Sequence, residues 1–168
     1  YWIANAGMGT TGNYSGHFRA NTGFVSEYGG IALPGLDSLR KILLPEELWG
    51  ERNTGLPRWK NLPIDVSAYA YQTSFEYDGL ASVIDRATQF VDRHIRSARE
   101  FVEGSQLYQA FLFKYATEAY RRKKYHSING TRIWAYGEVT PGIRFNFLDY
   151  YREPKMGYYF LQQAHRPL

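Results

Sequence analysis

Two glutamates stand where a strand is expected to end, and a carboxylate at such a position is able to act as a nucleophile or as an acid–base group. Glu27 follows the apolar pair Phe24-Val25 and precedes two glycines, a pattern that predicts a short buried strand ending in a turn. Glu138 closes a second β-rich run. Barrels of alternating strands and helices carry their catalytic groups at strand ends of this kind. A structural, hydrogen-bonded glutamate is the alternative.

Aromatic side chains are the second feature of the sequence that points to a function. The chain has 15 Tyr, 10 Phe and 4 Trp, which together make up 17% of its residues. Tyr and Trp rings combine a flat apolar face with a polar edge, as sugar-binding clefts require, although a large core also uses aromatic residues. His17, in a loop rich in Gly, Asn and Thr, is a further candidate for lining a cleft or is simply solvated.

The bulk composition excludes several classes of function. The 168 residues suffice for one domain, and 44% hydrophobic against 21% charged residues indicates a globular chain. The net charge is +4, but the basic residues are dispersed except at Arg121–Lys124, where they suit a helix end, so we expect no nucleic acid partner. No apolar run reaches membrane-spanning length, and no ligand cluster supports a metal or cofactor. The absence of cysteine excludes disulfides and thiolate chemistry.

Strands and helices are expected to alternate along the chain. The expected order is a loop over 1–23, a strand and helix over 24–43, an irregular excursion over 44–80, two helices over 82–124, a strand over 131–138 and a final helix over 153–165. Within this order, 45–49 predicts one helical turn, Gly104 is expected to end the first long helix, and Ser105 is expected to cap the second. Strands separated by helices favour parallel pairing. Two strands indicate either a small α/β domain or the last quarter of a barrel.

A set of longer motifs carries more information than either glutamate alone. They are residues 24–29, Pro34, 36–41, 45–49, Gln109, Arg121-Arg122, 129–134, 148–151, Pro154-Lys155, Tyr158-Tyr159 and 166–168. In this order, they resemble glycoside hydrolase family 2, and most closely its β-mannosidase and exo-β-glucosaminidase branches. The resemblance implies an α/β fold that forms the C-terminal portion of a (β/α)8 TIM barrel, the last two to three βα units, incomplete on its own. Because the chain starts at Tyr1 without Met, we expect an excerpt of a longer protein.

The resemblance also implies roles for individual residues. Glu27 matches the catalytic nucleophile at the end of the seventh strand, and Trp134 matches the eighth-strand tryptophan that forms the floor of the sugar subsite. Tyr28, Glu138 and His17 are expected to contact substrate as well. The family's Trp-Gln-Leu-Asn-Asp pattern is Trp-Ala-Tyr-Gly-Glu over 134–138 here, which leaves the preferred sugar open.

The implied reaction needs two carboxylates. A retaining glycosidase uses one as nucleophile and the other as acid and then base, about 5 to 5.5 Å apart. In the family the acid/base is a Glu that follows Asn at the end of the fourth strand, and the present sequence has no Asn-Glu pair. We therefore expect part of a retaining, exo-acting β-glycosidase that is inactive as an isolated chain. Its expected partners are a carbohydrate and the rest of the barrel or a partner chain, with a non-catalytic carbohydrate-binding or purely structural α/β domain as the alternative.

Overall fold

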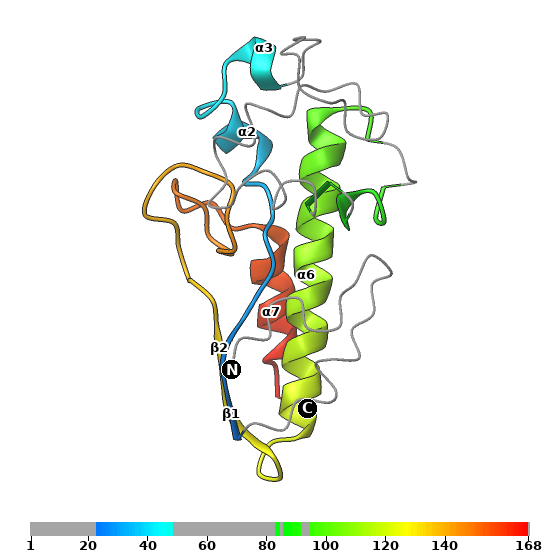
Figure 1. Ribbon diagram of the computed structural model, residues 1–168, viewed down its shortest axis with the longest axis vertical. Coiled ribbons are helices and arrows are strands. Elements are labelled where there is room, and N and C mark those ends of the chain that lie inside the picture. The colour runs from blue at the N-terminus through cyan, green and yellow to red at the C-terminus, as the bar shows by residue number, and fades with distance from the viewer. Residues whose placement is uncertain (1–22, 49–82, 85, 92–94, 168) are drawn as a thin grey trace.

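The structure is a computed structural model, and it describes residues 23–48, 83–84, 86–91 and 95–167. The described elements are two strands and four helices (Figure 1). In chain order they are β1 (Gly23–Tyr28), α2 (Leu36–Leu39), α3 (Pro45–Leu48), α6 (Ala98–Arg122), β2 (Ile128–Ile133) and α7 (Met156–Ala164). Most of the expected loop over 1–23 and of the excursion over 44–80 lies outside the described residues.

The two strands pair in parallel, as predicted from the helices between them. Gly23 lies opposite Ile128 and Tyr28 lies opposite Ile133, so the strands start and end together. Their carboxyl ends both point toward the end of the molecule that holds α2 (Figure 1). The described residues therefore form a mixed α/β structure with a small open sheet.

The second strand begins and ends earlier than the predicted range of 131–138. β2 is Ile128–Ile133, and the chain then leaves the extended conformation at Ala135, which has a φ of 60°. This left-handed conformation is uncommon for a residue other than glycine and breaks the strand geometry. Trp134 therefore lies just beyond the strand, and the residues after it form a loop.

The long helical region also differs from the prediction. We expected two helices over 82–124 with a break at Gly104, whereas α6 is one helix of 25 residues that passes through Gly104 and Ser105. Its start is set by Ser97, whose hydroxyl accepts a hydrogen bond from the Glu100 amide at 3.2 Å. The Glu100 carboxylate accepts from the Arg96 amide at 2.6 Å, which gives an arrangement close to a capping box.

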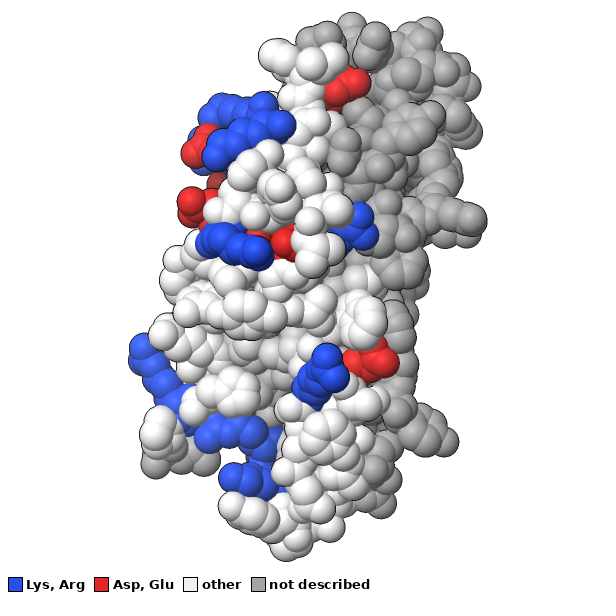
Figure 2. All heavy atoms as spheres, turned by 90° about the vertical axis from the view of Figure 1, so that its left-hand side faces the viewer, with Lys and Arg blue, Asp and Glu red and all other residues white. Residues whose placement is uncertain are grey.

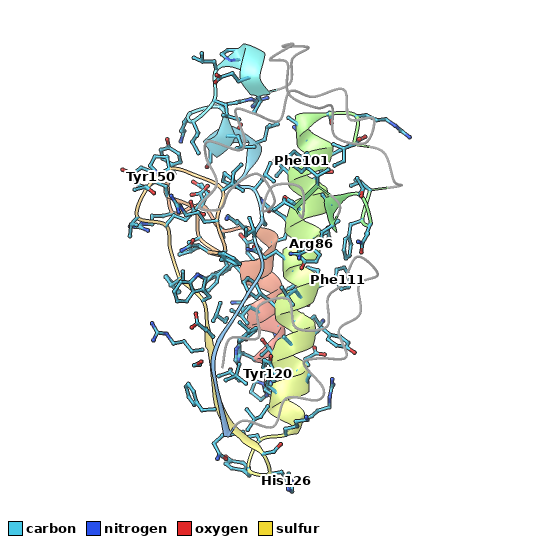
Figure 3. All side chains as sticks on the ribbon, in the orientation of Figure 1. Arg86, Phe101, Phe111, Tyr120, His126 and Tyr150 are labelled. Carbon is cyan, nitrogen blue, oxygen red and sulfur yellow. The ribbon has the colours of Figure 1, made fainter. Side chains whose placement is uncertain are left out.

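The apolar core forms two clusters along α6. One lies between the sheet, α6 and α7, and contains Val25, Tyr28, Tyr108, Leu112, Phe113, Ala116, Tyr120, Ile128 and Phe147. The other lies nearer the start of α6 and includes Leu33, Leu39, Val83, Ile84, Ala87, Phe101, Val102 and Ile143. Tyr120 lies between α6 and the strands in Figure 3, whereas Phe111 lies on the far side of α6. None of the described helices is long and apolar enough to cross a membrane.

Candidate functional site

Glu27 is the penultimate residue of β1, as predicted, and its side chain is half-buried. Val25 and Tyr28 are both fully buried in the core beside α6, although they are three residues apart. Strict alternation along a strand would bury residues 25 and 27 on one face. The register shift between Val25 and Tyr28 breaks this alternation, and such irregularities re-aim side chains. The core face at this level is therefore occupied by Tyr28, and Glu27 keeps access to solvent.

Trp134, the first residue after β2, adjoins the end of β1. Its backbone amide donates a hydrogen bond to the Tyr28 carbonyl at 2.9 Å, which extends the sheet pairing by one step. Its side chain is 42% exposed. A Cβ atom placed on Gly29 would lie 3.7 Å from the Trp134 Cβ, so Trp134 packs close to the chain two residues after Glu27. The structure therefore brings the two most specific sequence candidates to neighbouring strand ends.

Tyr28 occupies a different position from the one we expected. Its side chain is fully buried, and its hydroxyl lies 2.6 Å from the Thr117 hydroxyl on α6. Its ring packs edge-on against those of Phe113 and Tyr120. Burial raises the pKa of Tyr28 to about 12. This position gives Tyr28 a structural role between the sheet and α6, and it offers no phenol surface to a sugar.

Glu138 is also buried, where we expected a substrate contact. Its carboxylate accepts a hydrogen bond from the Lys155 amine at 3.0 Å, and both side chains are fully buried. The turn at Ala135 carries the chain back toward the core, and the Leu148 amide then donates to the Tyr136 carbonyl. Burial raises the pKa of Glu138, partly offset by Lys155, and burial lowers the pKa of Lys155. The pair is structural in this position, and neither group faces a cleft.

Sequence reasoning gave no site role to Lys155, although the sequence contains a signal for it. Lys155 stands at the N-cap position of α7, the end of a helix at which the macrodipole disfavours a cation. A lysine at this position, directly before a helix, indicates that a specific anionic partner lies nearby. The partner, Glu138, is 17 residues earlier in the chain.

A polar stripe on α6 was likewise missed. Gln109 is fully buried, and its amide group donates to the carbonyls of Gly30 at 2.7 Å and Phe145 at 2.9 Å. Gln106 donates to the Leu33 carbonyl, and the Ser105 hydroxyl accepts from the Leu33 amide. Polar residues in the middle of an apolar helix face are the sequence signal for such contacts. These side chains hold the chain that follows β1 against α6.

The remaining candidates add little to the site. His17 lies outside the described residues. Within the described ranges, no group of three or more His, Cys, Asp or Glu side chains is arranged to hold a metal ion. Figure 2, which faces the left-hand side of Figure 1, shows a band with few charged side chains between groups of charged ones. Tyr136, on the loop after β2, is 66% exposed.

The arrangement of these helices and strands is similar to part of a solved structure. No protein-family model matches the sequence, and no curated protein matches it. The crystal structure of β-D-mannosidase from Dictyoglomus thermophilum matches with a TM-score of 0.72 and 23% sequence identity over 89% of this chain. The match covers 16% of that chain, so the present chain spans a small part of the mannosidase's length. The chain therefore has the fold of a segment of this β-D-mannosidase.

Proposed function

We propose that the chain forms part of the catalytic barrel of a retaining, exo-acting β-glycosidase similar to glycoside hydrolase family 2, and that Glu27 is its nucleophile. One observation carries the proposal. Glu27 and Trp134 lie at the carboxyl ends of two paired parallel strands, in a fold similar to a segment of a β-D-mannosidase. Parallel strand ends are where (β/α) barrels hold their catalytic groups.

In the proposed reaction, a Glu27 carboxylate oxygen attacks the anomeric carbon of a sugar stacked on Trp134. The bond between the anomeric carbon and the leaving oxygen breaks, and a second carboxylic acid protonates that oxygen. Water then hydrolyses the glycosyl ester, and its proton goes to the second carboxylate, which regenerates both groups. The half-buried position of Glu27 suits this role because its carboxylate stays accessible to the sugar.

The proposed acid/base residue lies outside this chain. Glu138 is the other carboxylate that the sequence placed at a strand end, but it is buried and paired with Lys155. A barrel of this kind needs about eight strands, and two are present among the described residues. The small share of the mannosidase that the chain matches supports the same proposal.

The test is carried out in the longer protein that contains this chain, with aryl β-mannoside, β-glucosaminide and β-galactoside substrates. Glu27→Gln is expected to lower kcat by several orders of magnitude, because covalent catalysis is lost. Glu118→Gln is the matched control, since Glu118 is a partly exposed glutamate on α6.

Two further measurements identify the role of Glu27. A 2-deoxy-2-fluoro glycosyl fluoride should label the peptide that contains Glu27, as detected by mass spectrometry. Azide added to Glu27→Gly should yield the α-glycosyl azide, because azide then attacks from the face that the carboxylate used. A label on another residue, together with near wild-type turnover by Glu27→Gln, would overturn the proposal. Sugar binding without turnover in the wild type would instead favour a non-catalytic carbohydrate-binding module.

A further inference from the structure

Two loops leave the carboxyl ends of the paired strands. The β1 loop is residues 29–35 and follows Glu27, and the β2 loop is residues 134–154 and includes Trp134. We infer that Lys155 is a positioning residue that joins these two loops and thereby fixes the place of Glu27 relative to Trp134. The inference rests on the proposed function for its consequence in catalysis, but not for the contacts themselves.

The Lys155 amine makes one contact to the β1 loop and two to the β2 loop. It donates to the Ala32 carbonyl at 3.0 Å, to the Glu138 carboxylate at 3.0 Å and to the Arg144 carbonyl at 3.2 Å. A lysine ammonium has three N–H donors, so these acceptors match its full capacity. Its own backbone amide donates to the Phe147 carbonyl at 2.9 Å, which holds the start of α7 to the β2 loop as well.

The burial of this contact makes it rigid. The side chains of Lys155 and Glu138 are both completely buried, and the three acceptors around the Lys155 amine restrict it to a narrow geometry, although the second carboxylate oxygen of Glu138 has no hydrogen-bond partner among the described residues. The two loops also meet directly where the Ala32 amide donates to the Arg144 carbonyl at 3.2 Å. The same Arg144 carbonyl accepts from Lys155, so the amine lies at the junction between the loops.

The junction is close in sequence to both candidate groups. Ala32 is five residues after Glu27, and Glu138 is four residues after Trp134. A shift of about 1 Å in a catalytic group is able to cost about 100-fold in rate. A loose junction would therefore reduce catalysis without removing any group that touches the sugar.

The experiment compares three proteins with the longer wild-type protein that contains this chain. Lys155→Met removes the amine, and the double variant Glu138→Met/Lys155→Met also removes the partner charge, so that neither charge of the pair is left buried without the other. The matched control is Lys114→Met/Glu118→Met, which removes an ion pair of the same types from the partly exposed surface of α6. Hydrogen–deuterium exchange, kcat and KM are measured for each.

The double variant decides the inference. It is expected to keep a cooperative unfolding transition near that of the wild type, while exchange in residues 29–35 and 134–148 becomes about tenfold faster. Its kcat is expected to fall on the order of 100-fold, with a change in KM of less than about fivefold, because substrate contacts remain. The control pair is expected to change neither the exchange nor kcat.

Three outcomes would overturn the inference. Wild-type exchange and kcat in the double variant would mean that Lys155 only fills space. Unfolding of the double variant while the control folds would assign the pair to global stability. Faster exchange in both loops with unchanged kcat would separate the junction from catalysis. If the wild type hydrolyses no substrate, the proposed function fails, and the exchange measurement alone still decides whether Lys155 joins the loops.

Discussion

At the scale of single residues, the contact between Tyr28 and Thr117 links the sheet to α6. The two hydroxyl oxygens are 2.6 Å apart, and both side chains are buried. Burial raises the pKa of Tyr28 to about 12, whereas an unfolded tyrosine titrates near about 10. The folded state therefore keeps Tyr28 protonated at a pH at which the unfolded state ionises it.

This difference predicts a loss of stability at high pH. A group whose pKa is raised by folding contributes its full stability below the unfolded pKa, and that contribution is lost as the pH rises from about 10 toward about 12. Two pKa units correspond to about 3 kcal/mol. Tyr28→Phe is expected to destabilise the protein by about 1 to 3 kcal/mol at pH 8, because Thr117 loses its partner. It should also flatten the decline in stability above pH 10.

Urea unfolding at pH 8, 10 and 11 checks this prediction. Tyr120, whose pKa is also raised by burial, still titrates in the variant and leaves a smaller slope. Tyr125→Phe is a suitable control, since Tyr125 is 80% exposed. Removing its hydroxyl should leave the decline of stability with pH as steep as in the wild type. An equally steep decline in Tyr28→Phe and wild type would contradict the assignment.

Some of the candidate residues were predictable from sequence, and the reason is local. Glu27 follows an apolar pair and precedes two glycines, so the end of β1 was predictable. The local pattern placed Glu138 at the other strand end, and only the resemblance to a known family pointed to Trp134. The burial of Tyr28 and Glu138 depends on a register shift in β1 and on a positive φ at Ala135. Neither has a reliable sequence signature, since alanine is a poor indicator of left-handed backbone. The Lys155 contacts join residues 11 to 123 positions apart, which no local pattern encodes.

At the scale of elements, Gly104 shows why the helical region was predicted incorrectly. A glycine followed by serine is typical of a helix end and a new cap, so the sequence predicts a boundary there. In the structure Gly104 lies inside α6, where a Cβ atom would come within 2.7 Å of the Ala87 carbonyl oxygen. The glycine therefore allows the turn around Ala87 to pack closely on α6. Parallel pairing, in contrast, followed correctly from the order of strands and helices.

Close packing at Gly104 predicts the effect of a methyl group there. An ordinary glycine inside a helix would gain about 1 kcal/mol of stability on replacement by alanine. Gly104→Ala is instead expected to lose about 1 to 3 kcal/mol, because the nearest atom belongs to backbone and overpacking forces it to shift.

The matched control is Gly35→Ala, since a Cβ atom at Gly35 meets nothing within 4 Å and its φ of −59° suits alanine. Chemical denaturation of the two variants and the wild type measures the difference. Stabilisation by Gly104→Ala would mean that Ala87 does not lie against α6 and that Gly104 is an ordinary interior glycine of the helix.

At the scale of the whole molecule, the described sheet has two strands, and each has one edge that does not pair with the other strand. The face in Figure 2 carries few charged side chains in its middle. In Figure 3, His126, at the turn between α6 and β2, lies at the lower end of the described structure, and Tyr150, on the β2 loop, lies in its upper half. The proposed site belongs to the half with Tyr150, since the carboxyl ends of both strands point that way.

The proposed division of the site predicts how the isolated chain behaves. A retaining glycosidase needs an acid to protonate the leaving oxygen, and Glu138 is held by Lys155 away from solvent. The 168-residue chain alone is therefore expected to hydrolyse aryl β-glycosides no faster than its own Glu27→Gln variant. Adding the rest of the proposed barrel as a separate polypeptide should raise turnover in proportion to the complex formed, and only with Glu27 intact. Turnover by the isolated chain that Glu27→Gln abolishes would mean that these residues contain a complete site, and that the acid has to be sought among them.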